Sequence, residues 1–470
     1  MNILMVASEA TPFAKTGGLA DVLGGLPAAL AAHGEHVAVV MPAYRANVYP
    51  DAPREAYRNL GIPLGPGLSV DINQTIDRGV TFYFIHCPPL FDRAGIYGEG
   101  WDYADNYLRF AVLSMAALGV SRYLFRPDII HTHDWQAGLV PVYIREHFDL
   151  DPTFSGVKVL FTIHNAGYQG IFGPEILPLI ALDPRLFNPE QLEFFGKVNY
   201  LKGGIAWSHA VSTVSKAYAR EIQTPEYGFG LDGFLRKHAP IHGIVNGVDY
   251  SEWSPEHDPY IASNYSIDDL SGKAACKRAL LAEFGLPGQA NSQPLIGIVS
   301  RFARQKGFDL IADIAATLLE EDLSLVVLGS GEAEFESLFS DLATVRPDKV
   351  GVRTGYDNAL AHRIEAGADM FLMPSRYEPC GLNQIYSLRY GTVPVVRATG
   401  GLDDTIDEET GFKFRDYTGS ALLGAIRSAL EAYQDLDRWA AMMRRGMRKD
   451  FSWSAVAKEY LALYRQLLAG

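Results

Sequence analysis

The sequence predicts an α/β fold built from two domains of similar size. Short apolar, β-branched runs alternate with amphipathic helical patterns, which is typical of parallel sheets covered by helices on both faces. A length of 470 residues exceeds one ordinary domain. A polar stretch from Ser251 to Gln293 interrupts the alternation once. We therefore expect two α/β domains, residues 1–247 and 248–452, a hinge near Val248 to Pro255, and a final helix, residues 453–470, that returns to the first domain.

The strands of the first domain are expected where buried, β-branched runs occur. These runs are Ile3–Ala7, His36–Pro42, Thr81–His86, Asp128–His133, Val157–His164 and Ala210–Ser215. A helix is expected from Ala20 to Ala32, where apolar residues recur at helical spacing.

A second series of strands is expected near residues 294–300, 324–329, 350–355, 370–374 and 393–396. Helices are expected at Lys273–Phe284, Leu310–Leu319 and Trp453–Leu468. In open parallel sheets, ligands bind outside the carboxyl ends of the strands. Two such domains are therefore expected to form a ligand-binding cleft where these ends face each other.

The composition limits the partners and the compartment. A formal net charge of −14 disfavours nonspecific binding to nucleic acid, so any anionic ligand requires a local cluster of Lys and Arg. The cysteines, Cys87, Cys276 and Cys380, form neither a disulfide framework nor a zinc spacing, which favours a reducing cytoplasm. We expect no export signal, and no apolar run long enough to span or anchor in a membrane.

The segment Lys15–Asp21 is the first candidate anion site. Adjacent Gly17 and Gly18 lie between a predicted strand and a predicted helix, where exposed N–H groups and the helix N-terminus attract anions. Neither the G-x-x-x-x-G-K-[ST] nor the G-x-G-x-x-G spacing fits these residues. A phosphate or phosphosugar site is one interpretation, and a plain glycine turn with a solvated lysine is the other.

Two loops in the second half carry further candidate ligands. Arg301–Gly307 follows a predicted strand with several cations, which suit phosphate oxygens, although a solvated basic loop is the alternative. Glu378 follows an apolar strand and precedes a helix at about Asn383, which favours a ligand for sugar hydroxyls or, alternatively, a helix-capping carboxylate. Cys380 beside it is expected to be a small buried thiol.

Taken together, six motifs in order resemble the bacterial glycogen synthases and plant starch synthases. The resemblance covers nearly the whole chain and rests on Lys15–Val22, His131–Trp135, Thr162–Gly170, Val245–Asp249, Ser300–Gly307 and Glu378–Gln384. It implies the GT-B architecture, two Rossmann-like domains facing an interdomain cleft. It also implies an enzyme that transfers glucose from ADP-glucose to the non-reducing end of an α-1,4-glucan, with glycogen or a maltooligosaccharide as acceptor and with no cofactor and no metal.

The resemblance also implies roles for individual residues. The catalytic set comprises His164, Glu378, Arg301 and Lys306. The donor-binding set comprises Lys15, Gly17, Gly18, Asp21, Asn246, Tyr356, Cys380, Gly381, Leu382 and Asn383, with Tyr356 at the adenine ring. The acceptor-binding set comprises Tyr97, Asp134 and Trp135, since an aromatic face suits the apolar face of a sugar ring. The His131 and His133 spacing also suggests a metal, but the sequence supplies no evident set of partner ligands.

The family retains the anomeric configuration, and the motifs contain no pair of carboxylates of the kind that retaining glycosidases use. We therefore expect attack on the same face, with the departing phosphate accepting the acceptor's proton. Related transferases often place a second Glu eight positions after the first, whereas Tyr386 stands there in this chain, as in the synthase branch. A phosphorylase, a UDP-sugar epimerase of the same architecture and a noncatalytic glucan-binding protein remain alternatives. The sequence leaves open the oligomeric state and the choice between ADP-glucose and UDP-glucose.

Overall fold

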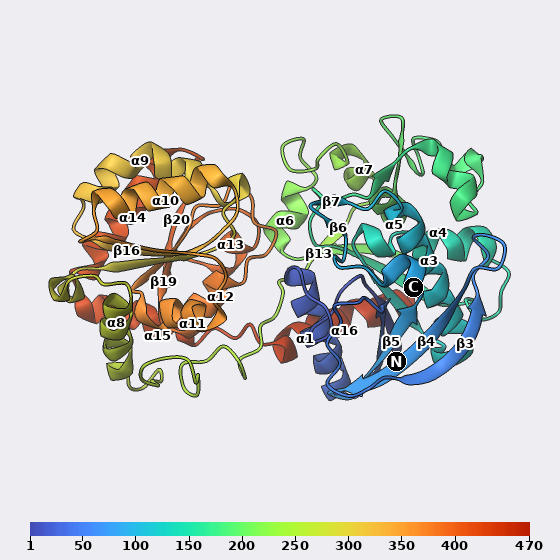
Figure 1. Ribbon diagram of the computed structural model, residues 1–470, viewed down its shortest axis with the longest axis horizontal. Helices are drawn as coiled ribbons and strands as arrows, with labels where there is room; N and C mark the ends of the chain where they lie inside the picture. The colour runs from blue at the N-terminus through green and yellow to red at the C-terminus, as the bar shows by residue number, and fades with distance from the viewer. The chain divides into compact units, whose positions relative to one another are not determined.

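The computed structural model describes residues 1–470, apart from the side chains of Gln289 and Asn291. The chain forms two compact units (Figure 1). Unit 1 contains Met1–Gly247 together with Trp453–Gly470, and unit 2 contains Val248–Ser452. Both units are built from helices and predominantly parallel strands, which confirms the predicted α/β class.

Unit 1 is organised around a nine-stranded sheet. From one edge to the other, its strands are β14 (Ile241–Gly243), β13 (Ala210–Thr213), β9 (Lys158–Ile163), β8 (Ile129–His133), β1 (Asn2–Val6), β2 (His36–Pro42), β5 (Val80–His86), β4 (Ser69–Asp77) and β3 (Arg54–Gly61). The six predicted strands of this half form within one or two residues of the expected bounds, because their apolar side chains are buried on both faces of the sheet.

The strands β3 and β4 were not expected from the sequence. They pair antiparallel with each other, and β4 pairs antiparallel with β5, at the edge of the sheet. Most side chains of β3 are exposed or partly exposed. A half-solvated hairpin of this kind lacks the continuous apolar run by which the other strands were recognised.

The helices of unit 1 are α1 (Gly18–Ala32), α2 (Pro88–Phe91), α3 (Asn106–Val120), α4 (Leu139–His147), α5 (Tyr200–Trp207), α6 (Lys216–Glu221), α7 (Asp232–Lys237) and α16 (Trp453–Ala469). Two small sheets complete the unit, β6 (Gly98–Glu99) with β7 (Trp101–Asp102), and β10 (Ile171–Phe172) with β12 (Lys197–Asn199) and β11 (Glu193–Phe194).

The last helix, α16, packs beside α1 (Figure 1). A Cβ built on Gly25 of α1 would lie 2.0 Å from Nε1 of Trp453, so only glycine allows this approach. The ring of His33, which follows α1, lies 3.0 Å from the carbonyl oxygen of Ser454. The two ends of the chain therefore share one core.

The length of helix α3 differs from what we expected of the apolar segments of this chain. It continues into a π-helical turn, and the combined helix Asn106–Phe125, 20 residues long, has the length and composition of a membrane-spanning segment. The expectation that no apolar stretch reaches this length is therefore wrong. Most of this helix is buried inside unit 1, which is the behaviour of a core helix.

Unit 2 contains a six-stranded parallel sheet. Its strands, in spatial order, are β17 (Val350–Thr354), β16 (Ser324–Gly329), β15 (Leu295–Val299), β18 (Met370–Met373), β19 (Val393–Arg397) and β20 (Phe412–Phe414). Its helices are α8 (Ser271–Glu283), α9 (Phe308–Glu320), α10 (Ala333–Val345), α11 (Asn358–Gly367), α12 (Asn383–Arg389), α13 (Gly400–Thr405), α14 (Gly419–Tyr433) and α15 (Leu436–Met447).

Helices cover both faces of this sheet (Figure 1), with α9, α10 and α14 on one face and α8 and α11 on the other. Alternate strand residues enter the two cores, as the side-chain period of a strand requires. For example, Ile296 and Ile298 of β15 pack with α9, whereas Leu295 packs with α8.

The polar stretch expected to be mainly a link is packed into unit 2. Trp253 stacks on Tyr386 with a ring-centroid distance of 4.0 Å, and Ser254 is fully buried. The guanidinium of Arg389 donates to Oγ of Ser254 at 3.0 Å. Proline and polar residues suggested a linker, but tertiary contacts with α12 hold this segment in place.

Candidate functional site

The glycine turn lies between β1 and α1, as predicted. Gly17 and Gly18 are exposed, and a Cβ built on either meets no atom within 4 Å. The backbone is therefore accessible to a ligand. Nζ of Lys15 forms an ion pair with Oδ1 of Asp21 at 2.7 Å, so two residues assigned to the donor lie side by side at the start of α1.

A carboxylate that the sequence did not single out, Glu9, already contacts this turn. Its residue is 3% exposed, and its carboxylate accepts hydrogen bonds from the backbone N–H and the hydroxyl of Thr16. The N–H of Gly17 donates to the same carboxylate at 3.4 Å, and the hydroxyl of Tyr97 donates at 2.9 Å. Burial raises the pKa of Glu9, although these hydrogen bonds oppose the shift. Glu9 thus joins the glycine turn to Tyr97.

The histidines of unit 1 form a buried polar group. His133 ends β8 and His164 follows the neighbouring strand β9, which places Nδ1 of His133 3.0 Å from Nε2 of His164. Burial lowers the pKa of His164 to about 3, and it also lowers the pKa of His133 well below the usual value. Both rings are therefore neutral near pH 7 and act as hydrogen-bonding groups.

His131 has two partners of its own. Its Nδ1 lies 2.7 Å from the hydroxyl of Tyr464 in α16, and its Nε2 lies 2.6 Å from Oγ1 of Thr162. One ring nitrogen thus joins the sheet to α16, and the other joins β8 to the neighbouring strand β9. Among the residues described, no group of three or more His, Cys, Asp and Glu side chains has the arrangement of a metal site.

Asp134 links the ends of the same two strands. It has a left-handed φ of 57°, which is uncommon for a residue other than glycine. Its Oδ1 accepts a hydrogen bond from the backbone N–H of His164 at 2.7 Å. Burial raises the pKa of Asp134 to about 7, against the opposing effect of backbone N–H donors from His164 and Asn165. A carboxyl group that titrates near neutrality thus supports His164.

Trp135 is part of the core. It is 8% exposed, and its ring contacts Phe110, Phe172 and Tyr200. A Cβ built on Gly170 would lie 2.3 Å from the indole, so the backbone at Gly170 packs directly against this ring. The packing gives Trp135 a structural role, and its assignment to the acceptor stays a prediction.

Asn246 follows β14 and is 7% exposed. Its Oδ1 has no hydrogen-bond partner among the side chains and backbone described. A buried amide oxygen without a partner is costly, unless a ligand supplies a donor.

In unit 2, the structure brings together the two predicted residues Lys306 and Glu378. They follow the neighbouring strands β15 and β18, and Nζ of Lys306 lies 2.7 Å from Oε2 of Glu378. The hydroxyl of Ser375, which the sequence did not suggest, donates to the same oxygen at 3.0 Å. The side chains of Lys306 and Glu378 are only 20% and 8% exposed, so the ion pair is shielded from solvent.

Close backbone contacts fix the loop of Glu378. Gly400 has a φ of +47°, and a Cβ built on it would lie 1.9 Å from the carbonyl oxygen of Glu378. The N–H of Gly401 donates to that oxygen at 3.1 Å, and a Cβ built on Gly401 would lie 2.0 Å from the carbonyl oxygen of Cys380. Only glycines permit α13 to approach so closely.

The following residues turn the chain into α12. Gly381 has a φ of +73°, and Leu382 precedes the first residue of the helix, Asn383. Nδ2 of Asn383 donates to the carbonyl oxygen of Val299 at 2.7 Å, which anchors the loop to β15. Cys380 is buried, as expected.

Two further predicted site residues of unit 2, one from the catalytic set and one from the donor-binding set, remain exposed. The guanidinium of Arg301 makes no hydrogen bond or ion pair with any side chain or backbone group described. Tyr356 is 82% exposed, and its hydroxyl contacts Oδ1 of Asn358 at 3.1 Å. Both side chains are therefore available to a ligand.

The fold defines a class of protein. Two Rossmann-like units, each built around a mainly parallel sheet, are typical of the GT-B glycosyltransferases, and comparisons with known proteins support this class. Residues 2–237 match the family model of the starch synthase catalytic domain, and residues 286–445 match that of glycosyl transferases group 1.

Relatives match along the whole length of the chain. A glycogen synthase of Koribacter versatilis is 53% identical over 99% of this chain and 98% of its own. A glycogen synthase of Anaeromyxobacter sp. is 49% identical over 100% of both chains. The catalytic domain of starch synthase IV from Arabidopsis thaliana, bound to ADP and acarbose, superposes with a TM-score of 0.88 at 32% identity, covering 100% of this chain and 99% of that one.

The chain therefore belongs to the glycogen and starch synthase family, and it is a glucosyltransferase of glycogen synthesis.

Proposed function

We propose that the protein transfers the glucosyl unit of ADP-glucose to the non-reducing end of an α-1,4-glucan, with retention of configuration and release of ADP. The observation that carries this proposal is the ion pair of Lys306 and Glu378 at the ends of β15 and β18, in a chain of the glycogen and starch synthase family. A relative that binds ADP and acarbose supports both the donor and the glucan acceptor.

The donor diphosphate is assigned to cations of unit 2. An ammonium group has three N–H donors, and Glu378 occupies one direction at Lys306, which leaves others for phosphate oxygens. The fork of Arg301 suits two oxygens at once. Both charges stabilise the negative charge that develops on the departing diphosphate, so they lower the barrier as well as the dissociation constant.

Glu378 is assigned to the hydroxyls of the transferred glucose. As a carboxylate it accepts hydrogen bonds, and Lys306 and Ser375 hold its Oε2 in place. Tyr356 presents an exposed ring for the adenine, and the loop Cys380–Asn383 is assigned to the same donor.

Unit 1 contributes the remaining predicted groups. The exposed backbone of Gly17 and Gly18, with Lys15 and Asp21, is assigned to the donor, and Asn246 supplies an amide oxygen in need of a donor. Neutral His164 is assigned to a hydroxyl of the reacting glucose, where Asp134 holds its backbone. Tyr97, Asp134 and Trp135 remain assigned to the acceptor side.

In the reaction, the bond from the anomeric carbon to the phosphate oxygen breaks, and the acceptor hydroxyl oxygen forms the new bond on the same face. The proton of that hydroxyl passes to the departing phosphate. No carboxylate other than Glu378 belongs to the predicted catalytic set, which favours this route over a double displacement.

A donor competition assay tests the proposal. Equal concentrations of ADP-glucose and UDP-glucose are supplied with a maltooligosaccharide acceptor, and the release of ADP and UDP is measured. We expect ADP to dominate and its release to depend on the glucan. A preference for UDP-glucose would refute the donor assignment, and turnover without glucan would point to an epimerase.

A further inference from the structure

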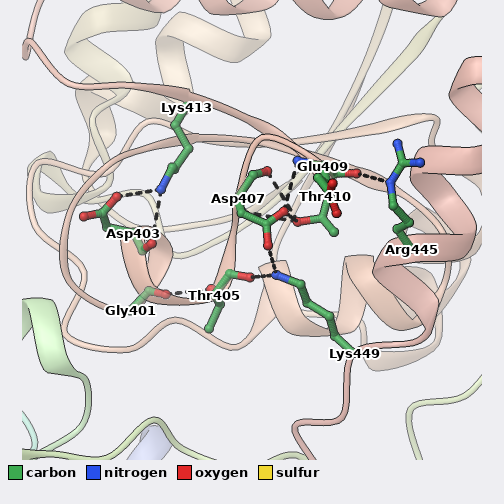
Figure 2. Close-up of polar contacts among 9 residues, drawn as sticks. All are labelled: Gly401, Asp403, Thr405, Asp407, Glu409, Thr410, Lys413, Arg445 and Lys449. Atoms are coloured by element: carbon green, nitrogen blue, oxygen red, sulfur yellow. Dashed lines mark hydrogen bonds and ion pairs between the residues drawn. The ribbon is translucent and has the colours of Figure 1, made fainter.

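The segment that ends unit 2 carries a lysine, Lys449, that reaches towards the loop of Glu378. Nζ of Lys449 donates to the carbonyl oxygen of Thr405, the last residue of α13, at 3.0 Å. It also pairs with Oδ2 of Asp407 at 2.6 Å (Figure 2). A cation at the carboxyl end of a helix satisfies carbonyl groups that lack partners within the helix.

From Thr405, the contacts continue to Glu378. Oγ1 of Thr405 donates to the carbonyl oxygen of Gly401 at 2.6 Å, as Figure 2 shows. The N–H of Gly401 donates to the carbonyl oxygen of Glu378 at 3.1 Å. Because Gly400 packs closely against that same oxygen, α13 cannot shift along its axis without displacing Glu378.

Lys449, at the start of this series of contacts, lies close to where the polypeptide enters and leaves unit 2, at Val248 and Ser452. The N–H of Val248 donates to the carbonyl oxygen of Phe451 at 2.9 Å. The hydroxyl of Tyr250 accepts from the N–H of Phe451 at 3.1 Å and lies 3.5 Å from the carbonyl oxygen of Lys449. Lys449 therefore lies on the segment to which the entering polypeptide is hydrogen-bonded.

We propose that Lys449 is a positioning residue, which holds Glu378 in place through Thr405 and Gly401 and makes this placement depend on the conformation of the segment 448–452. The inference rests on the proposed role of Glu378 and adds a residue outside the predicted donor and acceptor sets.

Lys413 in β20 is a matched control, because its side chain also binds α13. Its Nζ donates to the carbonyl oxygen of Asp403 at 3.2 Å and pairs with Oδ1 of Asp403 at 2.7 Å (Figure 2). The side chains of Lys413 and Lys449 are 22% and 27% exposed. Each lysine thus binds a backbone carbonyl of α13 and a carboxylate, which lies in α13 for Lys413 and just after it for Lys449. Only Lys449 contacts Thr405, whose hydroxyl donates to Gly401.

The experiment compares Lys449→Met, Lys449→Arg and Lys413→Met in the full-length protein. We expect Lys449→Met to lower kcat about tenfold, with the KM for the glucan unchanged, because small displacements of a reacting group are costly. Lys449→Arg should restore most of the activity, and Lys413→Met should stay within about twofold of the unsubstituted enzyme. Thr405→Val, which removes the hydroxyl without large loss of volume, should repeat the effect of Lys449→Met.

Hydrogen exchange provides a readout that does not depend on activity. Lys449→Met should speed exchange in peptides that cover both residues 399–406 and residues 376–384, whereas Lys413→Met should affect only the former. Equal losses of kcat in both methionine variants, or unchanged exchange at residues 376–384, would overturn the inference. If the unsubstituted enzyme transferred no glucose while the exchange result held, the proposed function would fail and the coupling of Lys449 to the Glu378 loop would stand.

Discussion

Lys306 and Glu378 are the residues on which the proposed chemistry depends most. They are 72 positions apart in the sequence, and they meet because β15 and β18 are neighbours in a parallel sheet. Each side chain is largely shielded, so removal of one leaves the other as a poorly solvated charge. Their separate roles are therefore best tested by replacing the cation.

We predict that Lys306→Met lowers kcat by about a hundredfold or more, because an organised cation no longer stabilises the departing diphosphate. Steady-state kinetics with ADP-glucose measures the effect. Arg304→Met is the control, since Arg304 lies in the same loop but is exposed and pairs with Glu334. Comparable losses in the two variants would contradict the assignment of Lys306.

Asp134 predicts a pH dependence of stability. Its folded-state pKa of about 7 lies above the usual value of 3.8, so between these values the folded protein binds more protons than the unfolded chain. A rise in pH through this interval therefore lowers the free energy of unfolding, and the full penalty is present above about pH 7. The amide of an Asn at this position still accepts the hydrogen bond from His164 but carries no charge.

We therefore expect Asp134→Asn to raise the free energy of unfolding, with a larger gain at about pH 8 than at about pH 5. Urea unfolding at both pH values, with the unsubstituted protein in parallel, measures the difference. A gain that is equal at the two pH values would show that the charge of Asp134 is not the cause.

At the scale of elements, the contact of α13 with the Glu378 loop depends on a glycine. Gly400→Ala would place a Cβ 1.9 Å from a carbonyl oxygen at a φ of +47°. We predict a loss of about 2 kcal/mol or more in the free energy of unfolding, together with loss of turnover. Gly424→Ala is the control, because Gly424 lies inside α14, where an added Cβ would meet no atom within 4 Å and alanine favours the helix.

Both activity and urea unfolding are measured for these two variants. If Gly400→Ala left kcat intact, the close approach of α13 would not be needed to place Glu378.

The sequence predicted most of the central strands and the long helices, but it predicted few of the tertiary contacts between them. Buried strands such as β2 and β16 form at the predicted bounds, because an uninterrupted apolar run has few other favourable conformations. The hairpin of β3 and β4 was missed because its exposed side chains leave only a weak pattern.

Contacts between distant segments explain the remaining differences at the site. Glu9 reaches Thr16 and Tyr97 through the fold of the turn and of a remote loop, and no local pattern marks this carboxylate. Gly170 and three aromatic residues enclose Trp135, contacts that no local pattern indicates, and its assignment to the acceptor stays a prediction. Lys306 and Glu378, in contrast, each follow a predicted strand, and the carboxyl ends of parallel strands lie at one edge of the sheet. The sequence therefore indicated that these two residues belong to one site, and the structure brings them together.

At the scale of the whole molecule, unit 1 is assembled from both ends of the chain. Trp453 fills the space left by Gly25 and Gly247, and Tyr464 supplies a hydroxyl to buried His131. Loss of α16 would expose the apolar face of α1 and leave His131 without one partner. Both effects lower the stability of unit 1.

We expect truncation after Ser452 to increase hydrogen exchange throughout α1 and β8, while peptides of β15 and β16 in unit 2 keep their protection. Truncation after Leu468 is the control, since Ala469 and Gly470 are exposed. Unchanged protection of α1 after removal of the whole helix would contradict a shared core.

Proton NMR of the reaction as it proceeds shows whether the enzyme transfers glucose to a glucan with retention of configuration. ADP-glucose and maltohexaose are mixed with the unsubstituted enzyme and, in a parallel sample, with Glu378→Gln. We expect the unsubstituted enzyme to produce a growing α-1,4 anomeric signal together with ADP, and we expect this signal to rise far more slowly in the variant. A β-configured product would refute retention, and release of free glucose without chain extension would refute transfer to the glucan.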